Sequence, residues 1–381
     1  MLREDAGHWA QAAGLALCAL VMASPSAANA ARVPSVAGPA APGAPALFNP
    51  GFECSVGIAP QAGIPGLVHE GWTGVLLDGR PTIFSGRWWV DWRCDGAGVE
   101  KIEGEDDAVF ISEDIETPPA PGKPFDAAVY QQVAVTPGTA YSLSGWMLSL
   151  CGGSAQPSSC PQGYYIAKML GIDPTGGINA LAPSVVWAED RHNFSDLDAI
   201  GRPLRWINLR LAVTARSDKL TVFGRIRSPY RWHGNHAFVD GFSLVRAPTA
   251  RLVELPSAVY GTQVTVRWDG AMGPDIAAVP GGTYQLLFDV QYQRKEATAW
   301  MDWQVGQPAS AAPFQVDGCA GTQAYSFRVR ARAEQPEGSH GAWPNQRYPG
   351  DWSDPAPVVF LNSGACTPRA YVPLIVLEPG G

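Results

Sequence analysis

Short runs of alternating apolar and polar residues, separated by turn signals, fill the chain from about residue 47 to residue 361. Alternation with a period of two is typical of half-buried β-strands, because successive side chains point to opposite faces. No long window carries the apolar stripe that marks a helix. The 42 Gly and 34 Pro are spread widely, which suits many short strands joined by tight turns. The pattern predicts an all-β protein.

The clearest strands lie between about residues 128 and 245. We expect strands over Ala128–Val135, Tyr141–Leu150, Lys219–Ile226 and Ala237–Val245. The segment Thr136–Thr139 carries Pro and then Gly, which predicts a tight turn, so we interpret the first two strands as a hairpin.

The strand Tyr141–Leu150 divides its side chains between two faces. The face that we expect toward the core holds Tyr141, Leu143 and Gly145. The opposite face holds Ser142, Ser144 and Trp146. Because the neighbours of this tryptophan on its face are polar, we expect that face to meet water or a ligand.

Four motifs in this region are found together in known modules: Asn49–Glu53 (NPGFE), Gly71–Trp72, the run from Tyr130 to Trp146 (YQQV, V, PG, Y, L, W) and Phe238–Leu244 (FVDGFSL). They resemble the jelly-roll carbohydrate-binding modules, the families that include cellulose- and xylan-binding modules. The resemblance covers about residues 47–247 and implies a jelly-roll β-sandwich.

A second set of motifs follows: Val264–Trp268, Tyr284–Tyr292, Tyr325–Arg332 (YSFRVRAR) and Asp351–Asp354 (DWSD). This part, about residues 251–361, resembles a fibronectin type III domain, which implies an immunoglobulin-like β-sandwich that serves as a spacer or an interaction platform. Arg328, Arg330 and Arg332 alternate with its core positions. Together with Trp352 and with Trp300, Trp303 or Trp343 they are similar to a Trp/Arg ladder, the alternative being solvated arginines.

The two ends of the chain have different characters. Residues 1–30 predict a signal peptide, with an apolar run at Gly14–Ala23 and a small-residue cleavage site at Ala28–Ala30. Residues 31–46 predict an Ala/Pro/Gly-rich linker. The C-terminal tail, residues 362–381, has a short apolar run that is similar to endings of other secreted bacterial proteins. We expect a secreted protein without a transmembrane segment, with retention at the cell surface as the other option.

The cysteines agree with export. Six remain after the signal peptide: Cys54, Cys94, Cys151, Cys160, Cys319 and Cys366. Six cysteines allow fifteen pairings. A domain boundary near residue 250 divides them four and two, and Cys151 and Cys160 bracket one polar loop. We therefore expect the disulfides Cys54–Cys94, Cys151–Cys160 and Cys319–Cys366.

The net charge and the motifs that are present or missing reduce the number of possible functions. The net charge of −8 argues against a nucleic-acid partner. The sequence has no G-x-S-x-G, H-E-x-x-H or Gly-rich phosphate motif, and we expect a non-catalytic protein. Sugar rings stack on aromatic side chains, so the 14 tryptophans point to a glycan ligand. The candidate ligand-binding residues are Trp146, Trp72, Trp88, Trp89, Trp92, Arg225 and Arg227. The alternative for these tryptophans is core packing.

In the resembled modules a structural calcium ion often lies where the opening Glu meets the Asp of the last strand. The matching residues are Glu53 and Asp240, and carboxylate oxygens suit calcium. The alternative is a plain hydrogen-bonded carboxylate. The sequence as a whole predicts a secreted binding or adhesion protein that recognises a glycan or glycan-bearing surface. The second interpretation is a structural cell-surface or matrix protein without sugar binding.

Overall fold

The computed structural model describes residues 45–85, 102–112, 121–150, 163–191, 206–233, 235–279, 283–316, 321–336 and 346–361. Every regular element in these ranges is a β-strand, apart from one 3-10 turn, η1 (Ile276–Ala278). No helix within the same ranges has the length and apolar character to span a membrane. The prediction of an all-β protein is confirmed.

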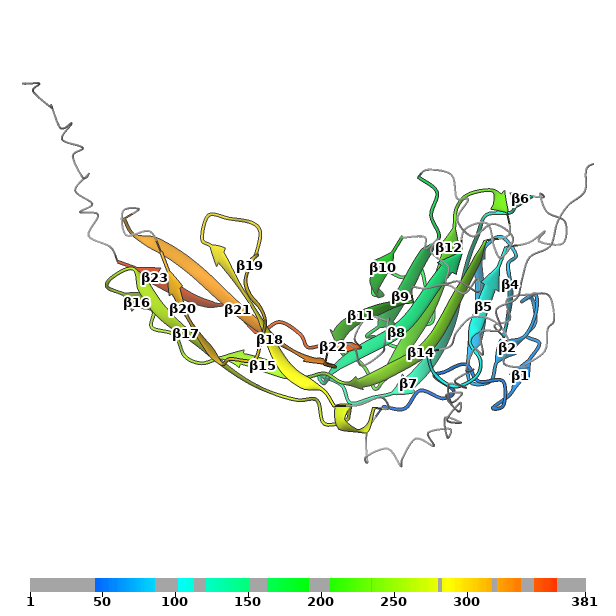
Figure 1. Cartoon of the computed structure of the whole chain (residues 1–381), viewed down its shortest axis with the longest axis horizontal. Coiled ribbons are helices and arrows are strands. Elements are labelled where there is room, and N and C mark those ends of the chain that lie inside the picture. Colours follow the sequence, from blue (N-terminus) through cyan, green and yellow to red (C-terminus); the bar gives the residue numbers. More distant parts are fainter. Residues whose placement is uncertain are drawn as a thin grey trace, which may run out of the picture. The chain divides into compact units, whose positions relative to one another are not determined.

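The first sandwich consists of two five-stranded sheets, both antiparallel, in the arrangement of a jelly roll (Figure 1). The first sheet has the order β10-β9-β12-β7-β3, with β10 (Val186–Asp190), β9 (Ala167–Asp173), β12 (Lys219–Ser228), β7 (Phe125–Ala134) and β3 (Thr73–Asp78). The second has the order β11-β8-β14-β5-β4, with β11 (Ile207–Thr214), β8 (Ala140–Leu150), β14 (His236–Arg246), β5 (Ala108–Ile111) and β4 (Thr82–Ser85). Two small pairs complete it: β1 (Ile58–Ala59) with β2 (Val68–His69), and β6 (Pro121–Gly122) with β13 (Trp232–His233).

The predicted strands exist, but the predicted hairpin is wrong. β7 pairs with β12 and β3, whereas β8 pairs with β11 and β14, so the turn at Thr136–Thr139 carries the chain from one sheet to the other. A Pro-Gly turn reverses the chain direction, and it does not decide which strands pair. Here the partners of β7 are far away in the sequence.

The core between the two sheets is built around stacked aromatic rings. Trp72 stacks on Phe52 with ring centroids 4.6 Å apart, and Phe242 meets both rings edge-on. Gly145 makes room for this cluster, because a Cβ at that position would lie 2.7 Å from the Phe242 ring. Burying each such side chain contributes roughly 1.5–3 kcal/mol to folding. The cluster therefore fixes how β8 and β14 lie against the opposite sheet.

The second sandwich has an immunoglobulin-like arrangement. A three-stranded sheet has the order β15-β17-β20, with β15 (Thr249–Leu252), β17 (Gln263–Ala271) and β20 (Ala311–Gln315). The facing sheet has the order β16-β23-β21-β18-β19, with β16 (Ala258–Val259), β23 (Ala356–Phe360), β21 (Gln323–Glu334), β18 (Gln285–Arg294) and β19 (Met301–Gln307); β22 (Arg347–Pro349) also pairs with β21. Its core includes Val266, Trp268, Phe314 and Phe327.

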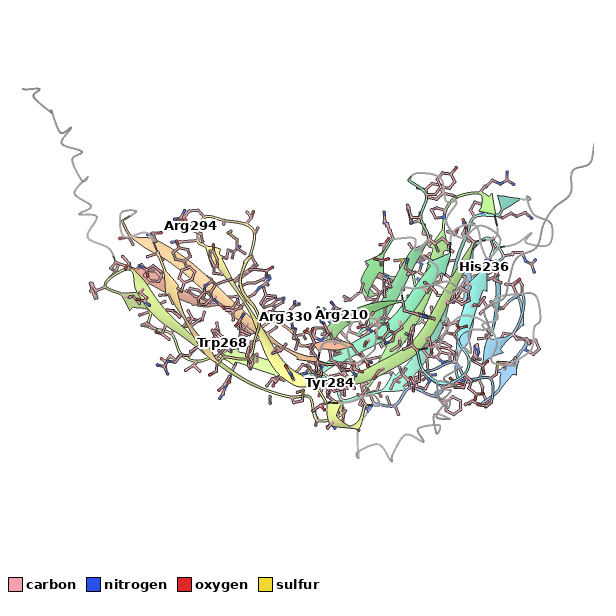
Figure 2. All side chains as sticks on the ribbon, viewed as in Figure 1. Arg210, His236, Trp268, Tyr284, Arg294 and Arg330 are labelled. Atoms are coloured by element: carbon pink, nitrogen blue, oxygen red, sulfur yellow. The ribbon has the colours of Figure 1, made fainter. Side chains whose placement is uncertain are left out.

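The Trp/Arg ladder is confirmed for part of its expected members (Figure 2 shows the side chains of this sandwich). The guanidinium carbon of Arg328 lies 4.3 Å from the Trp300 ring centroid and 4.5 Å from that of Trp352. Arg330 lies 4.6 Å from the same Trp352 ring. Arg332 instead pairs with carboxylates of Asp289 and Glu334. Trp303 packs against the core, and Trp343 lies outside the described residues.

Strand β22 lies against β8 and β11 of the first sandwich. The hydroxyl of Tyr348 on β22 donates a hydrogen bond to Ser243 Oγ at 2.9 Å. The Arg246 side chain forms a bidentate ion pair with Asp275. These contacts cover part of the second sheet's outer surface, where the sequence pattern predicts contact with water or a ligand.

Several predictions concern residues outside the described ranges. They are the signal peptide, nearly all of the linker, the C-terminal tail and all cysteines except Cys54. Cys54 is disulfide-bonded. Because the other cysteines lie outside those ranges, the three pairings stay predictions.

Candidate functional site

Trp146 is not exposed. It points away from the main core, as predicted, but only 1% of its surface is accessible. A second apolar cluster covers it on the outer side of β8, formed with Trp206, Phe238 and Leu148 and with Ile102 packed against it. The neighbouring Ser144 is also buried and accepts a hydrogen bond from Asn208 at 2.8 Å. The prediction that this face meets water or a sugar is wrong.

Trp72 is buried as well, with 2% of its surface accessible. Its ring is part of the core stack, and its indole N–H donates to the backbone oxygen of Asn49 at 2.9 Å. For Trp72 the alternative of core packing is therefore the correct one. The other three candidates, Trp88, Trp89 and Trp92, lie outside the described residues.

Arg225 and Arg227 lie on the other sheet, on the surface of β12 that faces away from the core. Their neighbours in the sequence, Gly224 and Ile226, face the opposite way, with Ile226 in the core. The Arg225 guanidinium forms a bidentate ion pair with Asp126 on β7, with Nε–Oδ1 at 2.8 Å and Nη2–Oδ2 at 2.6 Å. Arg227 is exposed. The structure therefore brings neither arginine together with Trp146.

An indole lies beside this ion pair. The side chain of Trp187 on β10 covers Gly171 of β9, its partner in the register. A Cβ at Gly171 would lie 2.5 Å from the six-membered part of the indole, so only glycine allows the ring to lie flat on the sheet. The guanidinium carbon of Arg225 is 5.5 Å from the Trp187 ring centroid. Trp187 remains partly exposed.

We define the outer face as the surface of the first sheet that carries Asp126, Tyr130, Trp187, Glu189, Phe223, Arg225 and Arg227. Part of it is covered, because Phe223 is fully buried under Ala180 and Val185 from the segment between β9 and β10. What stays accessible combines a partly exposed indole with charged hydrogen-bonding groups. That combination is what a sugar-binding surface requires: an aromatic plane for the C–H face of the ring and polar groups for its hydroxyls.

Three partly exposed tyrosines lie next to Arg191 where β10 ends. Tyr164 stacks on Tyr230 at 4.2 Å between centroids, and Tyr165 meets Tyr230 edge-on at 5.3 Å. The guanidinium carbon of Arg191 lies 4.8 Å from the Tyr165 ring centroid. Arg191 also pairs with Glu189, and this hydrogen bond raises the pKa of the arginine. Glu189 therefore links the tyrosine cluster to the outer face.

Sequence reasoning did not identify Trp187 or the three tyrosines as site residues. Trp187 lies in a short strand of five residues, and the glycine beneath it comes from another strand. The pair Tyr164–Tyr165 and the lone Tyr230 are visible as aromatics near strand ends. Their proximity depends on strand pairing, which a single sequence does not reveal.

Glu53 lies in a group of carboxylates. Both of its oxygens accept the backbone N–H of Glu105, at 3.2 and 3.0 Å. Burial raises the pKa of Glu53 to about 7; the hydrogen bond from Glu105 lowers it, and the charges of Asp106 and Glu103 raise it.

Asp240 is fully buried and satisfied by backbone donors. Its Oδ2 accepts the N–H groups of Ile102 and Glu103, at 2.8 and 3.1 Å, and its Oδ1 accepts that of Gly241 at 2.6 Å. Burial and the nearby Asp107 raise its pKa. In the part of the chain that the structure describes, no three His, Cys, Asp or Glu residues are arranged to hold a metal ion. The backbone hydrogen bonds match the alternative that the sequence left open, and the calcium site stays a prediction.

No protein-family model matches the chain, and neither does any curated protein. Among solved structures, the chain is similar to TmCBM61 in complex with β-1,4-galactotriose, with 15% identity, a TM-score of 0.31, and coverage of 52% of this chain and 97% of that one. A family 16 carbohydrate-binding module matches with 16% identity, a TM-score of 0.21, and coverage of 38% and 80%. The enzymatically active domain of tailspike protein 4 from bacteriophage CBA120 matches with 10% identity, a TM-score of 0.26, and coverage of 46% and 19%. At these TM-scores the similarities carry no argument about ligand or activity.

Proposed function

We propose that the protein is an exported, non-catalytic glycan-binding protein, and that the sugar lies on the outer face of the first sandwich, stacked on Trp187. One observation carries the proposal: a partly exposed indole is held flat on the sheet next to the Arg225–Asp126 ion pair. Export rests on the predicted signal peptide and on the cysteines.

The physical basis is pre-organisation. Trp187 is held between the backbone of Gly171 and the ring of Phe223, with 5.8 Å between the two ring centroids. Asp126 holds the Arg225 guanidinium in place through two hydrogen bonds. A sugar that binds such a surface orders few side chains, so less conformational entropy is lost on binding. Arg227 and Glu189 are further polar groups on the same face, available to sugar hydroxyls.

A glycan array probed with the full chain identifies the ligand, and titration calorimetry on the best glycan tests the site. Trp187→Ala is expected to weaken binding by roughly 1.5–3 kcal/mol, the scale of burying a large apolar side chain. Trp300→Ala is the matched control, since Trp300 is also partly exposed but lies in the second sandwich. It should bind as the unmodified chain does.

Two outcomes would overturn the proposal. If no glycan on the array binds, the second interpretation, a structural surface or matrix component, takes its place. If a glycan binds and Trp187→Ala has no effect, the outer face is not the site. A further assay tests whether the protein is non-catalytic: the bound glycan is incubated with the protein and cleaved products are measured. Any cleavage that requires the folded chain would refute this part of the proposal.

A further inference from the structure

An aromatic pocket opens in the second sandwich, between its two sheets. Its volume is about 470 Å³, within the range of roughly 300–1,000 Å³ typical of small-molecule sites. It lies where β20, at one edge of the three-stranded sheet, faces β18, β19 and β21 of the other sheet. The lining residues are Tyr292, Arg294, Trp303, Pro313, Phe314, Gln315, Val316, Gln323 and Tyr325.

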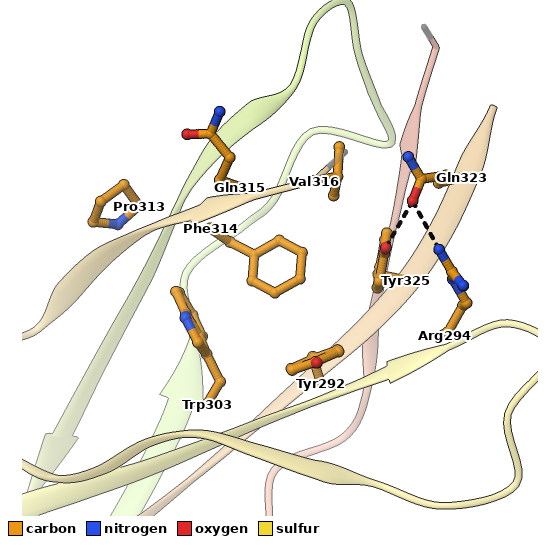
Figure 3. Close-up of a pocket in the computed structure, with 9 residues that line it drawn as sticks. All are labelled: Tyr292, Arg294, Trp303, Pro313, Phe314, Gln315, Val316, Gln323 and Tyr325. Carbon is orange, nitrogen blue, oxygen red and sulfur yellow. Dashed lines mark hydrogen bonds between the residues drawn. The ribbon is translucent and has the colours of Figure 1, made fainter. Parts of the chain in front are cut away.

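Four aromatic rings form the apolar part of the pocket. Phe314 is in the middle, 5.1 Å from Tyr292, 5.2 Å from Trp303 and 5.2 Å from Tyr325 between ring centroids (Figure 3). Trp303 and Tyr292 remain partly exposed, whereas Phe314 and Tyr325 are nearly buried. Because each ring is held by edge-on or tilted contacts with the others, this apolar surface is rigid before any ligand arrives.

Polar groups line the rim. Gln323 Oε1 accepts hydrogen bonds from the Tyr325 hydroxyl at 2.8 Å and from Arg294 Nη2 at 3.0 Å. Figure 3 shows these three residues on one side of Phe314, with Pro313 and Gln315 on the other. The Arg294 guanidinium also lies over the Tyr325 ring, 5.9 Å from its centroid. Gln323 and Tyr325 together therefore hold this cation at the mouth of the pocket.

Arg294 differs from most other ordered arginines of this sandwich. Arg251, Arg330 and Arg332 each pair with a carboxylate. Arg294 forms no ion pair within the described residues and contacts only a neutral amide and a ring. Among the described residues this guanidinium faces no carboxylate, so its charge beside the aromatic pocket can attract an anion.

We propose that this pocket is a second ligand site and that it binds a hexuronic acid unit of an acidic glycan. The pyranose ring would lie against Trp303 and Tyr292, because its C–H groups suit an aromatic surface. Its carboxylate would pair with Arg294, whose planar fork matches carboxylate geometry. Gln315 at the exposed rim is available to a ring hydroxyl. This site is independent of the outer face of the first sandwich.

The test uses the full chain and two pairs of methyl glycosides as probes. The first pair is glucuronic acid and glucose, and the second pair is galacturonic acid and galactose. Within each pair the sugars differ only at C6, where one carries a carboxylate. Saturation-transfer difference NMR with titration measures the affinities. For at least one pair the acidic sugar should bind about tenfold or more tightly, the scale of one charge-assisted hydrogen bond.

Arg294→Gln replaces the charged guanidinium with a neutral amide that can still donate a hydrogen bond, and it is expected to abolish the preference for the acidic sugar. Arg267→Gln is the matched control, since Arg267 is exposed on β17 and does not line the pocket. Trp303→Phe should weaken the binding of both sugars of a pair. A thermal melt of that variant verifies that it folds.

Trp187→Ala separates this site from the proposed glycan face, because it should leave hexuronate binding unchanged. Three results would overturn the inference. One is no binding of either acidic sugar; another is equal binding of acidic and neutral sugars. The third is hexuronate binding that survives Arg294→Gln and is lost in Trp187→Ala, which places the ligand on the first sandwich.

Discussion

Lys168 and Asp190 face each other across β9 and β10, with Lys168 Nζ 3.1 Å from Asp190 Oδ1. The Lys168 side chain is fully buried and also donates to Ser149 Oγ at 2.9 Å. Burial lowers the pKa of Lys168 to about 8, although the ion pair with Asp190 acts in the opposite direction. Because taking an ammonium group out of water is unfavourable, this pair adds little net stability. Each charge nevertheless offsets part of the free energy that burying the other one costs.

The two partners should therefore respond differently to mutation. Asp190→Ala removes one carboxylate that faces a buried ammonium and is expected to reduce the free energy of unfolding by about 3–5 kcal/mol. Lys168→Met should reduce the free energy of unfolding by less, because it removes the buried charge itself and the remaining residue, Asp190, is partly exposed. Denaturant unfolding near neutral pH measures both, with Glu189→Ala as an exposed neighbouring control. Equal costs for the two variants would contradict this account.

The pH dependence of the Lys168 contribution has a defined sign. Its pKa in the folded chain, about 8, is below the ordinary value of 10.5. Between these values the unfolded chain holds a proton that the folded chain has released, so stability gains from this group as pH rises through that window. The Lys168→Met variant should lack this gain when its unfolding is compared with that of the unmodified chain across the same window.

A substitution of Trp146 tests whether its side chain is packed in a buried cluster. Trp146→Ala should destabilise the chain by about 3–5 kcal/mol, because it opens a cavity in the cluster around Trp206 and Phe238. Trp187→Ala, which truncates a partly exposed ring, should cost much less. Far-UV circular dichroism during denaturant unfolding measures both changes. A cost below about 1 kcal/mol for Trp146→Ala would mean that the cluster does not pack as described.

The strand pattern was predictable because it is local. The alternation over Tyr141–Leu150 identifies a strand and assigns Trp146 to the face opposite Leu143, and the structure confirms both. Whether that face meets water depends on Trp206 and on β22, which come from distant parts of the chain. Strand pairing is non-local in the same way, which is why the hairpin prediction was wrong and why the glycine beneath Trp187 was missed.

The Trp/Arg ladder was predictable for the same reason. Arg328 and Arg330 alternate with core residues on one strand, so the sequence places both on the outer surface of β21. Only the structure shows which tryptophans these arginines contact. The position of Arg294 beside an aromatic pocket had no sequence signal, since four strands contribute to that pocket.

The ladder should stabilise the second sandwich. Arg328 lies over two indole rings, so Arg328→Ala is expected to reduce the free energy of unfolding by about 1–2 kcal/mol, twice the value of one exposed cation–π contact. Arg328→Lys should recover only part of this free energy, because an ammonium group has no plane that can stack on the two rings as a guanidinium does. Arg267→Ala, on an exposed strand surface, should change stability by less than about 0.5 kcal/mol. If Arg328→Ala behaves like that control, the ladder adds no stability.

Glu53 links the pH dependence of stability to the calcium prediction. Its pKa in the folded chain, about 7, is above the ordinary value of 4.5, mainly because the carboxylate is buried. Between these values the folded chain holds a proton that the unfolded chain has released. Stability from this group is therefore greatest on the acid side and is lost as pH rises through about 7. Glu53→Gln cannot lose a proton and should remove this part of the pH dependence.

A calcium ion bound near Glu53 would change that behaviour, because a cation favours the ionised carboxylate. If calcium binds, the melting temperature at about pH 8 should be higher with calcium chloride than with a chelator, since the ion binds only the folded state. The fall in stability with rising pH should also shrink, and Glu53→Ala should abolish the response to chelator. Magnesium chloride at equal ionic strength is the control for charge screening. Identical melting curves with calcium and with chelator would refute the calcium site, and the pH dependence caused by Glu53 would then stand alone.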